Sequence, residues 1–219
     1  MTKETTPQVE EAKKPTRERI LDAALDLFAQ KGYGNVYVGQ IAETVGIKAP
    51  SLYKHFKSKR DIFDALLQEL QSRYSVTAQG LHMNGNDAQA DGEHFTKVTE
   101  EELVNVGVGL FLYFLRDDYV RKFRKMLTIE QFSDPDLGAE LTKTYVDDPL
   151  VYQTQLFEIL ISSGTLIQGD AQVMALEFYT PIYMLLTLCD RDPKREKEAL
   201  KTLAEHFRQF NRIYGRNTK

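Results

Sequence analysis

The stretch that decides the fold spans residues 38–56 and reads VGQIAETVGIKAPSLYKHF. Ile41 and Val45 fall on one face of a first short helix, and Leu52 anchors a second helix from its inner side. Gly46 stands between them, where the absence of a Cβ atom permits a sharp turn. Two short helices joined in this way predict a helix-turn-helix unit.

The outer side of the second helix carries groups that suit nucleic acid. Hydroxyl, amine and imidazole groups can reach base edges or phosphates in the major groove of DNA. The alternative is a solvated helix junction, which a run of lysines often marks. The side chains concerned are Lys48, Ser51, Lys54, His55, Lys57 and Lys59.

The charge is unevenly distributed along the 219 residues, whose net charge is −4. Residues 1–60 carry 11 Lys and Arg against 7 Asp and Glu, a net charge of +4, whereas residues 61–219 carry 17 against 25, a net charge of −8. A basic head on an acidic body is typical of a DNA-binding module attached to a regulatory domain.

The sequence from residue 16 to residue 70 resembles the DNA-binding region of the TetR family of bacterial transcription regulators. This part is about a quarter of the chain, and its last block is the most specific. The blocks that carry the resemblance are RILDAA (19–24), LF (27–28), KGY (31–33), IA (41–42), VGI (45–47) and SLYKHFKSK (51–59).

The resemblance implies that the first helix braces the other two and that residues 49–56 form the recognition helix. It also implies that Lys59 contacts a phosphate near a helix N-terminus. The positions expected to contact DNA are Tyr37, Gln40, Lys48, Ala49, Pro50, Ser51, Tyr53, Lys54, His55 and Lys59.

Two residues depart from the family pattern. Tyr37 stands where the family has Ser or Thr, and a tyrosine cannot cap the following helix in the same way. Gly39 stands where a charged residue is common, and glycine weakens a short helix by up to about 1 kcal/mol relative to alanine. Both concern affinity and operator sequence more than the fold.

Apolar spacing predicts an all-α fold of about nine helices. The run at residues 108–115 reads equally as a buried strand, but no other strand candidate could pair with it. Around residues 80–92, glycine and asparagine predict a loop or hinge. The expected helices span residues 16–32, 38–45, 49–56, 58–79, 99–115, 117–132, 149–163, 170–189 and 193–214, with Thr16 as the first N-cap and Ser58 with Asp61 as a capping box.

Composition narrows the protein class. Hydrophobic residues make up 42% and charged residues 27%, which excludes global disorder. Cys189 is the only cysteine, so an intrachain disulfide or a cysteine-based zinc site is excluded. We expect a cytoplasmic protein, because no signal peptide or apolar run of about 20 residues is evident. The expected domains are a disordered tail (1–15), a helix-turn-helix domain (16–60) and a helical regulatory and dimerisation domain (61–219).

The last two helices are candidates for a homodimer interface. The helix at 170–189 is apolar nearly all round and needs cover on two sides. The alternative is that both helices belong to the core of one domain. The resemblance favours dimerisation, since family members generally pair through these helices. The predicted interface residues are Met174, Phe178, Ile182, Leu203, Phe207 and Phe210.

Aromatic residues in the acidic body predict a cavity for a small apolar or aromatic molecule. Packing is the alternative role for each ring. Pro181 would kink its helix, which can open a pocket. The candidates for ligand binding are Phe111, Phe114, Phe132, Tyr152, Phe157 and Tyr183.

Catalysis has little support in the sequence, and we expect neither an enzyme nor a metal or other cofactor. The four histidines are widely spaced, and no nucleophile motif surrounds them. The acidic pairs 117–118 and 147–148 stand at helix starts, where carboxylates complement the helix dipole.

Together these features predict a ligand-responsive repressor that binds a near-palindromic operator on double-stranded DNA as a homodimer, with recognition helices about 34 Å apart. In the family mechanism the effector shifts the helix at 58–79 and changes this spacing. Two alternatives remain: an interaction module that has lost DNA binding and acts through a partner regulator, and an enzyme or carrier that uses the helical body alone.

Overall fold

The structure, a computed structural model, describes residues 14–216. These residues form eleven α-helices, one π turn and one 3₁₀ turn, and their only β-type pairing is a single bridge between Leu166 and Gly215. The all-α prediction is therefore confirmed, and the run at 108–115 lies inside a helix. Residues 1–13 of the predicted tail lie outside the described part of the chain.

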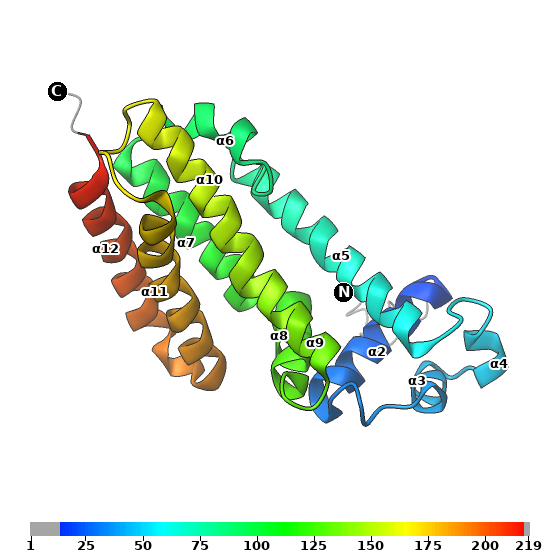
Figure 1. Cartoon of the computed structure of the whole chain (residues 1–219). Coiled ribbons are helices and arrows are strands. Elements are labelled where there is room, and N and C mark those ends of the chain that lie inside the picture. The colour runs from blue at the N-terminus through cyan, green and yellow to red at the C-terminus, as the bar shows by residue number, and fades with distance from the viewer. Residues whose placement is uncertain (1–13, 217–219) are drawn as a thin grey trace, which may run out of the picture. The chain divides into compact units, whose positions relative to one another are not determined.

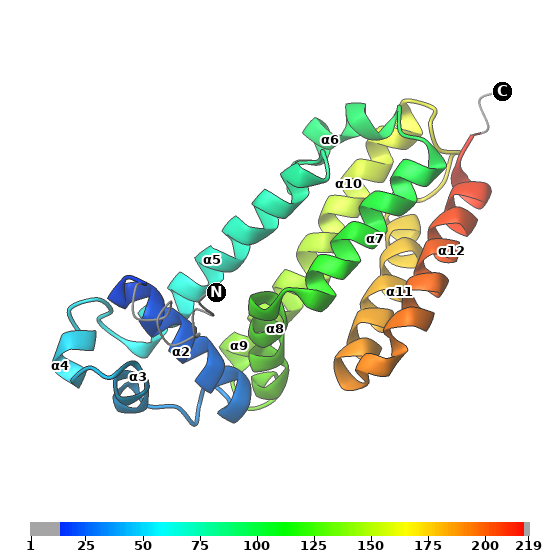
Figure 2. The same ribbon diagram turned by 180° about the vertical axis from the view of Figure 1, so that it is seen from behind.

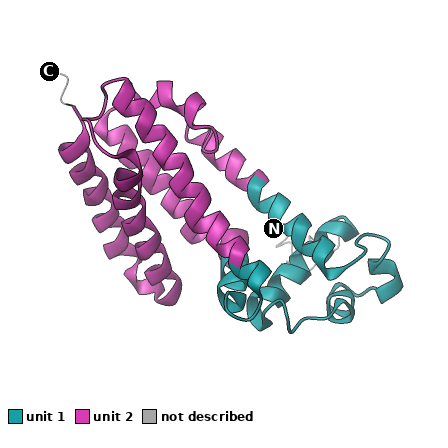
Figure 3. Cartoon of the chain, viewed as in Figure 1, with its two compact units in different colours: residues 1–71, 122–138 teal, residues 72–121, 139–219 magenta. Residues whose placement is uncertain are grey.

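The chain divides into two compact units, shown in different colours in Figure 3. Unit 1 takes in the described residues through Gln71 and then Lys122–Gly138. Its helices are α2 (Thr16–Lys31), α3 (Val38–Val45), α4 (Ala49–Leu52), the first half of α5 (Lys59–Gly80), most of α8 (Asp118–Glu130) and the start of α9 (Pro135–Thr142).

Unit 2 contains Ser72–Arg121 and Ala139–Lys219. Within it α7, α10, α11 and α12 run alongside one another (Figures 1 and 2), and α6 packs on α10. Besides the ends of α5, α8 and α9, its elements are α6 (Ala88–Phe95), α7 (Glu100–Arg116), the π turn η1 (Lys143–Asp147), α10 (Asp148–Ser162), α11 (Ala171–Arg191), the 3₁₀ turn η2 (Pro193–Arg195) and α12 (Glu196–Tyr214).

The expected boundary between a DNA-binding domain that ends at residue 60 and a regulatory domain that begins at residue 61 stays a prediction. The compact units divide the chain differently, because the chain crosses between them inside three continuous helices: α5 after Gln71, α8 after Arg121 and α9 after Gly138.

Local signals explain most helix ends, with two exceptions. The Ser58 hydroxyl donates to Asp61 Oδ1 at 2.7 Å and accepts the Asp61 N–H at 3.0 Å, so the predicted capping box is present. This hydrogen bond lowers the pKa of the Asp61 carboxyl. Thr16 is not the N-cap, since α2 begins at Thr16 and Pro15 precedes it as the cap. Gly32 ends α2 with a positive φ of 84°, but its ψ of 150° lies outside the left-handed helical region.

Two short helices were not expected, namely α6 and α9. Helix α6 lies in the region predicted as a loop, where Asp87 Oδ1 accepts the N–H groups of Gln89 and Ala90 at 3.0 and 3.1 Å. An aspartate N-cap overrides the nearby glycines because it satisfies two otherwise orphan donors of the first turn.

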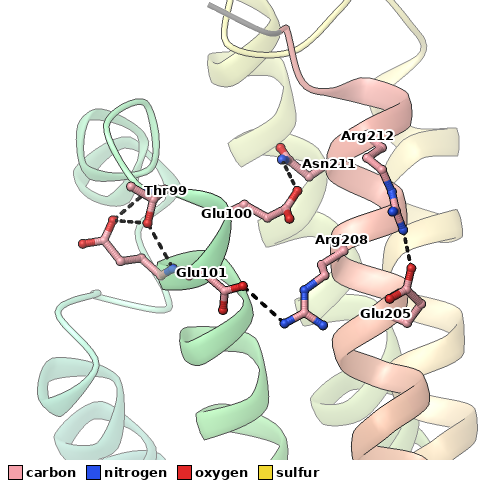
Figure 4. Close-up of polar contacts among 8 residues, drawn as sticks. Thr99, Glu100, Glu101, Glu205, Arg208, Asn211 and Arg212 are labelled. Carbon is pink, nitrogen blue, oxygen red and sulfur yellow. Dashed lines mark hydrogen bonds and ion pairs between the residues drawn. The ribbon is translucent and has the colours of Figure 1, made fainter.

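Polar contacts join the start of α7 to the last turns of α12 (Figure 4). Glu100 accepts a hydrogen bond from Asn211 at 3.0 Å, and Glu101 pairs with Arg208 at 3.4 Å. Thr99 and Glu102 form a capping box that begins α7. The acidic first turn complements the helix dipole, while the exposed ion pair adds little stability.

Helix α11 is long and apolar enough to cross a membrane when judged by length and composition alone. The core helix of a water-soluble protein meets the same test, and Met174, Ala175 and Leu186 of α11 are buried in the core of unit 2. Packing against the core of unit 2 therefore explains the apolar residues on one side of α11.

Candidate nucleic-acid interface

The helix-turn-helix of unit 1 is built from α3, a glycine turn and α4. Gly46 adopts φ 75° and ψ 32°, a left-handed conformation that caps α3. The Ile47 N–H then donates to Ala42 O at 2.9 Å. Ile41 and Leu52 are fully buried. Because the turn residue has no Cβ, the second helix can leave at the sharp angle that the sequence predicts.

Helix α2 braces this unit through two arginines. Arg19 Nη2 donates to Val45 O at 2.6 Å, at the carbonyl end of α3, where a cation is favourable. The Arg17 guanidinium lies 5.0 Å from the ring centroid of Phe56. Both ends of the helix-turn-helix are thus held by the first helix.

The recognition segment is shorter as a regular helix than expected. Helix α4 covers Ala49–Leu52 rather than 49–56. The N–H groups of Lys54 and His55 bond three residues back, to Ser51 O and Leu52 O, at 3.3 and 2.8 Å. The chain therefore continues as a tight turn.

The predicted DNA-contacting side chains of this segment remain available to solvent. Tyr53 is 52% exposed, and none of the predicted residues in the segment is buried. The exposed ones are Lys48, Pro50, Tyr53, Lys54 and His55, while Ala49 and Ser51 are partly exposed.

At the start of α3, Gln40 supplies one half of a capping box, and the half that a Ser or Thr at position 37 would supply is missing. Gln40 Oε1 accepts the Tyr37 N–H at 2.9 Å, and the Tyr37 side chain makes no cap hydrogen bond. The Tyr37 ring is 73% exposed. One acceptor of Gln40 is therefore occupied within the chain, whereas the ring and hydroxyl of Tyr37 face solvent.

Lys59 is turned toward its own unit. Its ammonium donates to Tyr33 O at 2.8 Å and to Val36 O at 3.0 Å, and lies 4.2 Å from the centroid of the Tyr33 ring. Burial lowers the pKa of Lys59. Two of the three ammonium protons of Lys59 already have acceptors, so Lys59 stabilises the loop between α2 and α3. The expected phosphate contact would be an additional role.

Sequence reasoning missed the part that α8 plays in unit 1. The buried Glu130 carboxylate accepts the Gly34 N–H at 2.9 Å and the Ser133 hydroxyl at 2.7 Å. A Cβ atom on Gly32 would lie 2.5 Å from Glu130 Oε1. The C-terminal end of α8 therefore stabilises the loop that leads into α3 by hydrogen bonding. No local pattern marks this contact, because the partners are 96 residues apart.

The predicted ligand-binding residues do not gather at one place. Phe111 and Phe157 are buried in the core of unit 2, and Phe114 and Tyr152 pack against it. The Tyr183 ring stacks near Tyr179, with centroids 6.4 Å apart. Phe132 is separate from the other five, since it belongs to unit 1 and is 94% exposed in the turn after α8.

An irregular turn in unit 2 brings Tyr145 and Tyr179 together. Proline at position 149 has no N–H, so Tyr145 O lacks the donor four residues ahead that an α-helix would supply. The Tyr179 hydroxyl donates to this carbonyl at 2.7 Å, and the backbone between forms the π turn η1.

The predicted dimer residues are mostly core residues. Five of the six, Met174, Phe178, Leu203, Phe207 and Phe210, are at most 8% exposed within the single chain. The three phenylalanine rings pack together, with the Phe178 and Phe210 centroids 4.9 Å apart, and Phe210 also stacks on Phe157. Burial within the single chain fits the alternative that these five residues belong to the core of unit 2, whereas Ile182 is partly exposed; the interface itself stays a prediction.

The apolar residues that α11 and α12 leave uncovered lie on other faces. On α11 these are Val173, Leu176 and Met184, and on α12 Ile213, each about half exposed. Spacings of three and eight residues place the three α11 residues on one side of the helix.

Comparison with known proteins gives this geometry a context. Residues 20–66 match the family model described as bacterial regulatory proteins of the tetR family. The chain is 26% identical over 156 residues to IcaR, the negative transcriptional regulator of the biofilm operon icaADBC in Staphylococcus aureus, covering 66% of this chain and 77% of that protein. It is 40% identical over 67 residues to the class D tetracycline repressor protein of Escherichia coli, covering 29% and 31%.

Solved structures share the fold over nearly the whole chain. SmeT, the repressor of the Stenotrophomonas maltophilia multidrug efflux pump SmeDEF, has a TM-score of 0.65 at 17% identity, covering 95% of this chain and 94% of SmeT. A complex of SmeT with triclosan has a TM-score of 0.67 at 20% identity, covering 94% of each chain.

Proposed function

The chain belongs to the TetR family of DNA-binding transcriptional regulators, and from this premise we propose that it is a repressor that binds a near-palindromic operator as a homodimer and is released by a small apolar or aromatic effector. The family is one of regulators and not of enzymes. A regulator of this kind acts on DNA inside the cell, in line with the expected cytoplasmic location.

The observation that carries the proposal is the exposed recognition segment on a rigidly braced frame. Lys54 and Tyr53 are exposed, whereas Leu52 and Phe56 of the same segment are buried, and Arg17 of α2 packs on the Phe56 ring. Preorganised donors on a short helix are suited to base edges, with lysines for phosphates. IcaR, a negative regulator, and SmeT, a repressor, support the direction of regulation.

Dimerisation is proposed through the uncovered apolar side of α11 together with Ile213, in place of the buried stripe. Val173, Leu176 and Met184 are apolar, about half exposed and on one side of α11. Two-fold pairing of such a surface would give two recognition segments, matched by two operator half-sites.

Release by an effector is proposed to act through α5. This helix continues from unit 1 into unit 2 without a break, so an effector that prefers one position of α5 biases the other unit. SmeT binds triclosan, an aromatic molecule, which supports the same chemical class of effector for this chain.

The test is selection of bound fragments from genomic DNA followed by affinity measurements at several salt concentrations. We expect the protein to prefer particular DNA sequences and to bind them more weakly as the salt concentration rises. The Tyr53→Ala/Lys54→Ala double variant should no longer retain DNA. Lys201→Ala, an exposed lysine of unit 2, is the matched control and should bind as the parent does. Salt-independent binding, or binding without sequence preference, would contradict the proposal and favour docking to a partner regulator.

A further inference from the structure

Three aromatic rings surround Phe114 within unit 2. The centroids of Tyr74, Tyr113 and Tyr145 lie 5.9, 5.2 and 6.3 Å from that of Phe114. These four residues, here called the Phe114 cluster, come from α5, α7 and η1. Edge-on and tilted ring pairs at these distances form an aromatic surface with specific geometry.

The cluster takes its rings from α5, in which the chain crosses between the two units, and from α7 and η1, which adjoin the two other crossing helices, α8 and α9. Tyr74 follows the crossing in α5 by three residues. Phe114 stands near the end of α7, the helix before α8, and Tyr145 stands in η1, the turn after α9. A molecule that displaced these rings would act directly on α5, because Tyr74 lies in this crossing helix.

The hydroxyl groups of the cluster differ in their bonding. Tyr74 donates to Gly85 O at 3.0 Å. The Tyr113 hydroxyl is buried and has no hydrogen-bond partner among the described residues. A buried donor without a partner destabilises a fold, so its presence calls for an explanation. A tyrosine hydroxyl carries its proton at neutral pH and can donate it in a hydrogen bond, and burial raises the pKa of Tyr113 further.

Charges beside Tyr113 are already paired with each other. Asp117 lies 3.7 Å from Arg73 and accepts the Val120 N–H at 3.0 Å. The Arg73 guanidinium also lies 4.6 Å from the Tyr119 ring centroid. An anionic ligand would meet the Asp117 carboxylate, so the acceptor that suits Tyr113 is uncharged.

The segment that bears Tyr145 is the one best able to change. Its π turn lacks regular α-helical bonding, and such turns recur at functional sites. The Tyr145 carbonyl depends on the Tyr179 hydroxyl from α11. A ligand between the rings can therefore move η1 without breaking a continuous α-helix.

We propose that the Phe114 cluster is the effector contact of this protein, and that its effector is a planar aromatic molecule with an uncharged acceptor, such as a ketone oxygen, for the Tyr113 hydroxyl. The inference rests on the proposed function, because it names the chemical class of the proposed effector. It assigns the ring contacts to Phe114, Tyr74 and Tyr145 and the single directional contact to Tyr113.

The test compares 9-fluorenone with fluorene, which share a tricyclic frame but differ in the carbonyl group. Titration of the full chain should show the ketone bound about three- to tenfold more tightly, the worth of one hydrogen bond. Tyr113→Phe should abolish this preference. Tyr214→Phe, which removes a hydroxyl outside the cluster that bonds to Glu177, should retain it.

Thermal unfolding gives a second, ligand-free reading. Because the Tyr113 hydroxyl has no partner, Tyr113→Phe should melt at the temperature of the parent or higher. A lower melting temperature, equal affinities for the two probes, binding of neither, or a preference that survives Tyr113→Phe would each overturn the inference. DNA retention is measured without either probe, so failure of the repressor proposal is recorded separately.

Discussion

The hydroxyl of Tyr152 lies 2.6 Å from Asp91 Oδ2, a polar contact between α10 and the short helix α6, which packs on it. Asp91 is 3% exposed and also accepts the N–H groups of Asn84 and Gly85 at 2.6 and 2.8 Å. A buried carboxylate is tolerated when donors surround it, as three do here. This hydrogen bond and burial, with burial the larger cause, raise the pKa of Tyr152.

Tyr152→Phe should therefore destabilise the protein. Asp91 would lose one of its donors while staying buried, which costs about 1–3 kcal/mol. Urea unfolding followed by circular dichroism measures the change. Tyr53→Phe, on an exposed ring, is the control and should stay within about 0.5 kcal/mol of the parent. An unchanged midpoint for Tyr152→Phe would show that the contact adds no stability.

Gly32 and Glu130 should be energetically coupled. Gly32→Ala places a Cβ atom 2.5 Å from Glu130 Oε1 at a φ of 84°, so we expect a loss of about 2 kcal/mol. Glu130→Ala leaves the Gly34 N–H without its acceptor and should cost about 1–3 kcal/mol. The double variant should lose less than the two single losses together, because the clash is gone.

A matched glycine provides the control for this cycle. A Cβ atom on Gly39 meets nothing within 4 Å, so Gly39→Ala in α3 should stabilise the protein by up to about 1 kcal/mol. Strict additivity of the Gly32 and Glu130 losses would refute the coupling.

Lys54 and Lys59 should separate DNA binding from stability. Lys54→Ala should reduce the slope of log affinity against log salt by about one and leave stability within about 0.5 kcal/mol. Lys59→Met keeps the aliphatic stem but removes the bonds to Tyr33 O and Val36 O, so it should cost about 1–2 kcal/mol of stability. Denaturant unfolding and DNA titration of both variants decide the matter; identical behaviour would contradict the assignment.

The oligomeric state should depend on the exposed side of α11. Leu176→Glu places a charge on an uncovered apolar position and should convert the dimer to a monomer with unchanged helix content. Val151→Glu, at an exposed apolar position of α10, should leave the dimer intact. Sedimentation velocity distinguishes the two species. A monomeric parent, or a dimer that tolerates Leu176→Glu, would exclude this interface.

Alkaline pH should destabilise unit 2 through its buried tyrosines. Burial, together with the smaller effect of the neighbouring Asp91 charge, raises the pKa of Tyr74 from 10.0 to about 12. The folded state then holds a proton that the unfolded state releases, so stability falls as the pH rises from 10 through about 12. Two pKa units correspond to about 2–3 kcal/mol.

The change of unfolding free energy with pH measures this effect. Tyr74→Phe should reduce the loss between pH 10 and 12, while part of it should persist because the pKa values of Tyr113 and Tyr152 are also raised. If the unfolding free energy of parent and variant depended on pH equally, ionisation of the buried Tyr74 hydroxyl would not be a cause of the stability loss.

The helix-turn-helix could be predicted because its signals are local. Ile41, Gly46 and Leu52 lie close together in the sequence, in two consecutive helices and the turn between them, and the structure places them as expected. The capping box could be predicted for the same reason, because Ser58 and Asp61 are only three positions apart. Helix α6 shows the limit of this reasoning, since the Asp87 cap was hidden among turn-forming residues.

Helices α11 and α12 show where such reasoning fails. Phe178 and Leu203 have the apolar character of an interface and of a core alike, and only the tertiary structure shows that both are buried within the single chain. Phe132 looked like a pocket residue and proved to be exposed.

By itself the sequence determined the all-α class and the helix-turn-helix, because helix periodicity, caps and turns depend on residues a few positions apart. Tertiary structure alone decided what distant residues do. Glu130 meets Gly34 across 96 residues, and Tyr152 meets Asp91 across 61. Long-range pairing depends on which helix faces pack together, and an apolar helix leaves that choice open until the whole chain has folded.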